Sequence, residues 1–255
     1  MKKFNKNTLL VLMLTLGTLF PLSANVFAEE SPSHWGYGGA ANPTQWGQIK
    51  KDFALCESGR DQSPIDLKNA VESSPAKIDF DYKSSPLVVV NNGHTIQVNY
   101  APGSSVTING EKYSLVQFHF HTPSEHEVNS KALAMELHLV HRNEAGKLAV
   151  VGVMLTKGTA NPLIDTIWKN IPSAGKTNTV SSSNINATDL LPKGKSYYSY
   201  DGSLTTPPCS EGVKWNVFVE TMTISEEQIA AFEKLYQVDA RPIQPSNGRV
   251  IQLHR

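Results

Sequence analysis

Three histidines in two short segments have the spacing of a metal site. Gln117, His119 and His121 alternate with two phenylalanines, so in a β-strand the three polar side chains share one face. His138 lies in a second segment, between two leucines. If the two segments are antiparallel neighbours, three imidazoles converge on one point. Three neutral histidines with an open fourth position form the ligand set of a catalytic zinc ion, whereas one isolated His-x-His pair would more simply be a polar strand face.

Two further polar residues are placed to support these rings. Gln117 and Glu136 each lie two positions before a histidine of the predicted set, on the same strand face. Imidazoles that are buried among apolar neighbours need hydrogen-bond partners, so we expect both side chains to accept a ring N–H. Two more histidines in this region, His126 and His141, are interpreted as structural polar groups.

The segments that contain these residues have the sequence pattern of β-strands. Several stretches between 77 and 155 are rich in β-branched and aromatic residues and are separated by turn residues. These predicted strands are Leu87–Val90, Thr95–Val98, Ser105–Ile108, Tyr113–Phe120, Leu133–His141 and Leu148–Leu155. Helical pattern is sparse, with candidates at Pro162–Ile171 and Ser225–Tyr236, the second of which opens on a capping-box pattern. The sequence predicts a mostly β (α+β) fold, with a large, predominantly antiparallel sheet and short peripheral helices.

The first residues resemble an export signal. Lys2, Lys3 and Lys6 precede an uncharged, largely apolar run at 9–20, and Val26-Phe27-Ala28 offers small residues at a cleavage site. The alternative is a transmembrane or lipid-linked anchor, but the run is shorter than the roughly 20 apolar residues that span a bilayer. We therefore predict a signal peptide at 1–28 and one exported domain at 29–255, periplasmic or extracellular, with no stable membrane anchor.

Charge and cysteine content narrow the function further. Lys and Arg number 23, as do Asp and Glu, and this balance gives no indication of a nucleic-acid partner. The two cysteines, Cys56 and Cys209, most often pair in an exported chain. Two free thiols are the alternative.

Several blocks of this sequence resemble the alpha-class carbonic anhydrases, in particular the secreted bacterial type. The resemblance extends from residue 34 to 245 in family order, and the combination is far more specific than any block alone. The blocks are His34-Trp35-Gly36-Tyr37, Gln62-Ser63-Pro64-Ile65-Asp66, Asn91-Asn92-Gly93-His94, Gln117 to His121, Ser124-Glu125-His126, Glu136 to His141, Gly202-Ser203-Leu204-Thr205-Thr206-Pro207-Pro208, and Arg241-Pro242-Ile243-Gln244-Pro245. The spacer from His121 to Glu125 is shorter than in the animal members.

The resemblance implies a fold, a cofactor and a reaction. The fold is a large twisted sheet with zinc at the base of a cone-shaped cleft, and one Zn²⁺ per chain is held by His119, His121 and His138. The reaction is the reversible hydration of carbon dioxide to bicarbonate and a proton, by attack of zinc-bound hydroxide. Carbon dioxide and bicarbonate are then the small-molecule partners, and a homodimer is compatible with the bacterial relatives.

The resemblance also implies roles for the residues around the metal. Thr205 resembles the gatekeeper hydroxyl that donates a hydrogen bond to Glu125, with Thr206 beside it, and His94 resembles the proton shuttle. The polar side of the cleft is expected at Tyr37, Asn92 and Gln97; the apolar wall that receives the substrate at Val140, Val150, Leu204, Val213 and Trp215; and a disulfide at Cys56 and Cys209.

Two other functions fit parts of the pattern. Related domains that lack the zinc ligands serve as binding modules, but the intact histidine set with Glu125 and Thr205 argues against that interpretation. A secreted zinc hydrolase of esters is the other alternative, although no pocket motif for a larger substrate is present.

Overall fold

The computed structural model describes residues 34–73 and 78–255. The predicted signal peptide at 1–28 and the first residues of the predicted domain lie outside this part of the chain. No helix within the described residues is long and apolar enough to cross a membrane.

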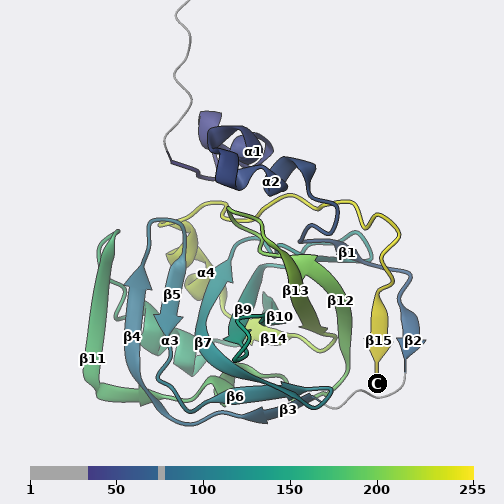
Figure 1. Cartoon of the computed structure of the whole chain (residues 1–255). Coiled ribbons are helices and arrows are strands. Elements are labelled where there is room, and N and C mark those ends of the chain that lie inside the picture. Colours follow the sequence, from purple (N-terminus) through teal and green to yellow (C-terminus); the bar gives the residue numbers. More distant parts are fainter. Residues whose placement is uncertain (1–33, 74–77) are drawn as a thin grey trace, which may run out of the picture. The chain divides into compact units, whose positions relative to one another are not determined.

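A large mixed sheet dominates the fold (Figure 1). Its main path runs β11 (Lys176–Ile185), β4 (Ser85–Asn91), β5 (Ile96–Asn99), β7 (Glu111–His121), β9 (Met135–Arg142), β10 (Leu148–Lys157), β13 (Glu211–Phe218), β12 (Tyr197–Ser203), β15 (Gln252–His254) and β2 (Val71–Ser73). Off this path, β14 (Met222–Ile224) pairs with β10, and β3 (Ile78–Asp81) pairs with β6 (Ser105–Ile108), which itself pairs with β7. A separate pair joins β1 (Asp66–Leu67) to β8 (Glu127–Val128). Most pairs of the large sheet are antiparallel, as predicted; β10 with β13, β10 with β14, and β15 with β2 are parallel.

The helices are short, as predicted. They are α1 (Trp46–Ile49), α2 (Leu55–Ser58), α3 (Pro162–Trp168) and α4 (Glu226–Glu233), with 3-10 turns η1 (Gly39–Ala41), η2 (Pro43–Gln45), η3 (Lys51–Phe53) and η4 (Ala187–Leu190). The predicted capping box of α4 is formed between Ser225 and Gln228. Gln228 also accepts from the main-chain N–H of Asn161, the residue that caps α3, so the two helices are joined at their N-terminal ends.

The central strands separate an apolar face from the face that carries the histidines. Phe118 and Phe120 of β7 lie in a large apolar cluster that also contains Ile164 of α3 and Phe232 of α4. Because side chains alternate along a strand, the intervening His119 points to the opposite face. A register shift between Leu115 and Gln117 brings His119 directly opposite His138 of β9. The sheet thus places all three predicted metal ligands on one face of two neighbouring strands.

Candidate active site

The rings of the three predicted ligand histidines lie together on β7 and β9. Their ring centroids are 5.0 Å apart for His119 and His121, 5.3 Å for His119 and His138, and 4.6 Å for His121 and His138. One nitrogen from each ring lies within 4.8 Å of the other two. This arrangement could hold a metal ion.

Each ring has one nitrogen engaged by an outer partner. His119 Nδ1 lies 2.9 Å from Gln117 Oε1, and His121 Nδ1 lies 2.7 Å from the main-chain oxygen of Asp239. His138 is turned the other way, with Nε2 2.9 Å from Glu136 Oε1, a close ionic contact that lacks the geometry of a hydrogen bond. The nitrogens left to face one another are therefore Nε2, Nε2 and Nδ1.

The inward nitrogens fit a metal ion better than a hydrogen-bond network. His121 is almost fully buried, and its Nε2 has no hydrogen-bond partner among the described residues. A buried ring nitrogen without a partner is costly unless it donates its lone pair to something. Three neutral ring nitrogens around one point are the donor set that zinc accepts, so the residues present fit this metal.

Glu125 lies beside the inward nitrogens. Its Oε2 is 3.5 Å from His121 Nε2 and 3.8 Å from His138 Nδ1, and its Oε1 accepts the main-chain N–H of Arg241 at 2.8 Å. Thr205 is buried. The expected hydrogen bond from its hydroxyl to Glu125 is not formed in this structure, since Glu125 Oε2 has no hydrogen-bond partner among the described residues.

The electrostatics of the rings follow from burial and from the nearby carboxylates. Burial lowers the pKa of His119 far below its usual value and also lowers that of His138. Burial opposes protonation of His121 as well, but the Glu125 and Asp239 carboxylates outweigh it and raise its pKa. Burial alone would raise the pKa of Glu136, yet His126 and His138 hold it well below the usual range.

His126 has a more specific place than a structural polar group. Its Nδ1 lies 2.8 Å from Glu136 Oε1, and its main-chain N–H donates to Glu136 Oε2 at 2.8 Å. Its Nε2 lies 2.6 Å from the Tyr200 hydroxyl, which donates to Ser63 Oγ at 2.9 Å. His126 therefore fixes the carboxylate that supports His138. His126 precedes β9, which carries Glu136, and the two residues are ten positions apart. No periodicity of the sequence relates these positions, so the contact could not be predicted.

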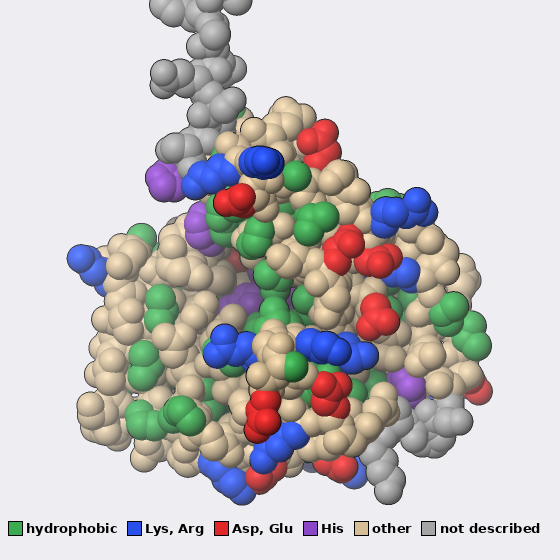
Figure 2. Space-filling view, in the orientation of Figure 1, with side chains coloured by type: hydrophobic (Ala, Val, Ile, Leu, Met, Phe, Trp, Pro, Cys, Tyr) green, Lys and Arg blue, Asp and Glu red, His purple; other side chains and the backbone are tan. Residues whose placement is uncertain are grey.

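A small cavity of about 120 Å³ opens beside the histidines, and Figure 2 shows histidine and hydrophobic side chains at the floor of a hollow on this face. All three residues predicted for the polar side, Tyr37, Asn92 and Gln97, line it, together with Trp35 and Thr95, for which no site role was predicted. The lining residues are Trp35, Tyr37, Asn92, His94, Thr95, Gln97, Gln117, His119, His121 and Thr206.

His94 lies at this cavity and is stacked on Trp35. The two ring centroids are 3.7 Å apart with an interplanar angle of 10°, and burial lowers the pKa of His94. Asn92 Oδ1 accepts the main-chain N–H of His94 and of Thr95, each at 2.9 Å. The predicted turn at Asn92-Gly93 thus holds the imidazole at the cavity.

The predicted apolar wall lies in one cluster next to His138. Val150, Val213 and Trp215 are buried there, and Val140 and Leu204 pack against them. The Trp215 ring centroid is 4.8 Å from that of His138. The predicted disulfide between Cys56 and Cys209 is present.

Comparisons with known proteins find similarity along nearly the whole chain. The model of the eukaryotic-type carbonic anhydrase family matches residues 41–255. A carbonic anhydrase of Nostoc sp. is 43% identical over 245 residues, which cover 94% of this chain and 93% of that protein.

Solved structures of carbonic anhydrases are also similar to this chain. A hyperthermostable carbonic anhydrase from an active hydrothermal vent chimney is 48% identical, with a TM-score of 0.85 over 87% of this chain and 100% of that one. The alpha-carbonic anhydrase of Thermovibrio ammonificans, solved with the inhibitor sulfanilamide, is 41% identical, with a TM-score of 0.83 over 86% and 98%. On these similarities the chain is an enzyme that belongs to the eukaryotic-type carbonic anhydrase family, whose general reaction is the hydration of carbon dioxide.

Proposed function

We propose that this carbonic anhydrase holds one zinc ion on His119, His121 and His138, that hydroxide generated there attacks carbon dioxide, and that His94 exports the proton. The single observation that carries the proposal is the orientation of the three rings. Their outer nitrogens lie 2.7 to 2.9 Å from oxygens of Gln117, Asp239 and Glu136, which supports an arrangement in which three lone pairs face the same point.

The histidines supply the ligands, and the metal supplies the acid chemistry. Zinc lowers the pKa of a bound water to about 7 in carbonic anhydrases, which provides hydroxide near neutral pH. Outer acceptors keep the ring protons on the outer nitrogens and make the inward nitrogens better donors. The charged partner of His138, Glu136, contributes most to this effect.

The cavity and the apolar cluster beside His138 both suit a small substrate. The cavity has a volume of about 120 Å³, which admits a molecule of few atoms, and it is lined by polar and aromatic residues and not by the apolar cluster. The cluster around Val150, Val213 and Trp215 lies next to His138 and offers no hydrogen bond that a polar substrate would need, and carbon dioxide needs none. The polar residues of the cavity are then available for water and for the proton.

Thr205 is proposed to orient the nucleophile. If its hydroxyl donates to Glu125 Oε2, its oxygen can only accept, and it therefore holds the hydroxide in one orientation. Glu125 is suited to this because its other oxygen is already fixed by the Arg241 N–H. Preorganised polar contacts of this kind act most strongly where water is excluded.

His94 is proposed to carry the proton outward. Its imidazole is half-buried at the cavity and stacked on Trp35, and an imidazole gains and loses protons near neutral pH. Burial lowers its pKa, which favours release of the proton once it has been accepted.

Export is also proposed, with the signal at 1–28 removed. A buried disulfide between Cys56 and Cys209 supports it, because such bonds persist mainly in oxidising compartments.

The proposal is tested on the purified mature protein by elemental analysis and stopped-flow hydration, with and without a chelator. We expect one zinc per chain and a rapid hydration that the chelator abolishes. His138→Ala should lose metal and activity together. Absence of stoichiometric zinc after metal-replete expression, or hydration that survives complete zinc removal, would contradict it.

A further inference from the structure

Arg241 is a buried cation at the junction of three segments that surround the site. Its relative exposure is 2%, and it forms no ion pair among the described residues, so neutral oxygens hold it. The guanidinium donates to Gln62 Oε1 at 2.9 Å, to the Ser63 carbonyl at 2.8 Å and to the Cys56 carbonyl at 2.8 Å. It also lies over the Trp46 ring, 5.8 Å from the centroid. These contacts fix both the position and the plane of the side chain.

The main chain of the same residue reaches the site. The Arg241 N–H donates to Glu125 Oε1 at 2.8 Å, and the other oxygen of that carboxylate faces His121 and His138. The segment after α4 that carries Arg241 is irregular. No strand ladder holds its position near Glu125, which depends on single main-chain bonds, from Asp239 to Thr122 and from Gln244 to Pro64, and on two buried side chains, Asp239 and Arg241. Of the two side chains, Arg241 is the one that connects the segment to Gln62 and Cys56.

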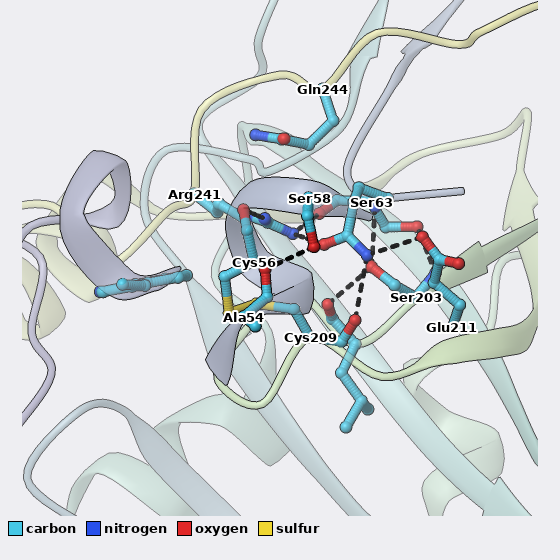
Figure 3. The surroundings of a disulfide bond; sticks show 12 residues. Ala54, Cys56, Ser58, Ser63, Ser203, Cys209, Glu211, Arg241 and Gln244 are labelled. Atoms are coloured by element: carbon cyan, nitrogen blue, oxygen red, sulfur yellow. Dashed lines mark hydrogen bonds between the residues drawn. A yellow bond between two sulfur atoms is a disulfide. The ribbon is translucent and has the colours of Figure 1, made fainter. Parts of the chain in front are cut away.

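Gln62 extends the anchor to the Thr205 segment. Its Oε1 accepts from Arg241, and its Nε2 donates to the Cys209 carbonyl at 3.0 Å and to Glu211 Oε1 at 3.1 Å. Figure 3 shows Arg241 near the disulfide between Cys56 and Cys209, with Ser63, Ser203 and Glu211 together on the other side of the view. Cys209 follows Thr205 by four positions, and its N–H donates to the Thr206 carbonyl.

We propose that Arg241 is a positioning residue for the hydration reaction, which fixes the Glu125 carboxylate through its main chain and the Thr205 segment through Gln62. The inference rests on the proposed function, because the hydrogen bond between Thr205 and Glu125 that it would support is itself part of that proposal. A guanidinium suits the task because its rigid fork bonds several oxygens at once, which the single ammonium of lysine cannot do in the same geometry.

The test is Arg241→Lys in the zinc-loaded enzyme. We expect zinc to be retained, because no ligand changes, and kcat/KM for hydration to fall about tenfold, as for other residues that orient groups around a metal. In the cobalt-substituted protein, the pH dependence of the visible spectrum should change in the same direction as in Glu125→Gln. A merely structural role would not alter that spectrum.

Arg249→Lys is the matched control. Arg249 also donates to main-chain oxygens, including that of Gln62, and lies over an aromatic ring, but its main-chain N–H bonds Ser246 and not Glu125. We expect Arg249→Lys to lower the melting temperature while kcat/KM and the cobalt spectrum stay at the wild-type values.

A double-mutant comparison separates positioning from general damage. If Arg241 acts through Glu125, Arg241→Lys combined with Glu125→Gln should be no slower than Glu125→Gln alone. If Arg241→Lys does not fold, Gln62→Leu removes the link to the Thr205 segment, and its effect should likewise vanish when combined with Thr205→Ala. The inference would be overturned if the losses in kcat/KM of the single variants multiply in the double variants. It would also be overturned if the wild type is active and Arg241→Lys has the same kcat/KM as the wild type. An inactive zinc-loaded wild type would instead refute the proposed function.

Discussion

At the scale of single residues, the site depends on how each imidazole proton is held. A neutral imidazole has one N–H and one lone pair, so an acceptor on the outer side leaves the lone pair inward. His119 has a neutral amide as its outer partner, His121 a main-chain carbonyl and His138 a carboxylate. The last of these is itself held by His126. The orientation of each proposed ligand ring is thus determined by the residue that contacts its outer nitrogen.

The proposed role of His94 as a proton shuttle gives a prediction at the same scale. His94 faces the cavity but is outside the predicted ligand set, so His94→Ala should keep full zinc. The attack on carbon dioxide uses hydroxide already formed, and kcat/KM should hardly change. Because hydroxide regeneration needs proton transfer to buffer, kcat should fall in dilute buffer, and added imidazole should restore much of it.

Stopped-flow hydration at low and high buffer concentration measures this split. A kcat in dilute buffer equal to that of the wild type would reduce His94 to a turn residue. A collapse of kcat/KM would show a binding or structural role in its place.

The ring partners that lie on the same strand as their histidine could be predicted from the sequence. Gln117 and Glu136 were predicted to accept a ring N–H from a spacing of two. The Gln117 hydrogen bond is present, and Glu136 lies 2.9 Å from His138 Nε2 without the geometry of a hydrogen bond. Asp239 was not predicted, because it acts through a main-chain oxygen 118 positions from His121. A carbonyl carries no side-chain signature, and nothing in a periodic pattern relates such distant segments.

At the scale of elements, a buried pair connects the β3 and β6 ribbon to the main sheet. Tyr82, which follows β3, places its hydroxyl 2.8 Å from Nε2 of His141 on β9. Both side chains are buried. Burial lowers the pKa of His141 from 6.5 to about 4 and raises that of Tyr82, so His141 is neutral at pH 7 and Tyr82 keeps its proton.

This pair predicts a loss of stability in acid. Below pH 6.5 the unfolded chain protonates His141 while the folded chain does not, so the free energy of unfolding should fall from pH 6.5 down through pH 4. The full contribution is about 3 kcal/mol. Denaturant unfolding at pH 7, 5.5 and 4 should show a shallower decline in His141→Gln than in the wild type. Parallel declines in the two proteins would exclude His141 as the cause.

The predicted strands between 87 and 155 are confirmed, whereas β11 to β15 were not predicted, including β13, where Val213, Trp215 and Val217 alternate with polar residues. The strands from β4 to β10 that pass through the core were anticipated with small differences at their ends. β11 was missed because its residues are mostly Thr, Ser and Asn on an exposed edge. The bulge near Val116 was also missed, although it sets His119 opposite His138.

At the scale of the whole molecule, the disulfide connects the N-terminal helices to the loop after Thr205. It joins residues 153 positions apart, and a closure of that length stabilises by at most about 5 kcal/mol in the chain-entropy model. We expect no alkylatable thiol in the native mature protein and a lower melting temperature after reduction. Two reactive cysteines in native material would refute the assignment; Cys56→Ser with Cys209→Ser is the variant that measures the stabilisation without reductant.

The parallel pair of β2 and β15 constrains when the fold can form. β15 lies between β12 and β2 in the sheet, although residues 71–73 and 252–254 are far apart in the sequence. Contacts between such distant segments require chain-closure entropy to be lost before any ladder forms, and they slow folding. The sheet therefore cannot be completed while only the first part of the polypeptide has been synthesised. If the chain is exported as proposed above, this late pairing would delay completion of the fold until the polypeptide has left the ribosome, and a translocation channel requires an extended polypeptide.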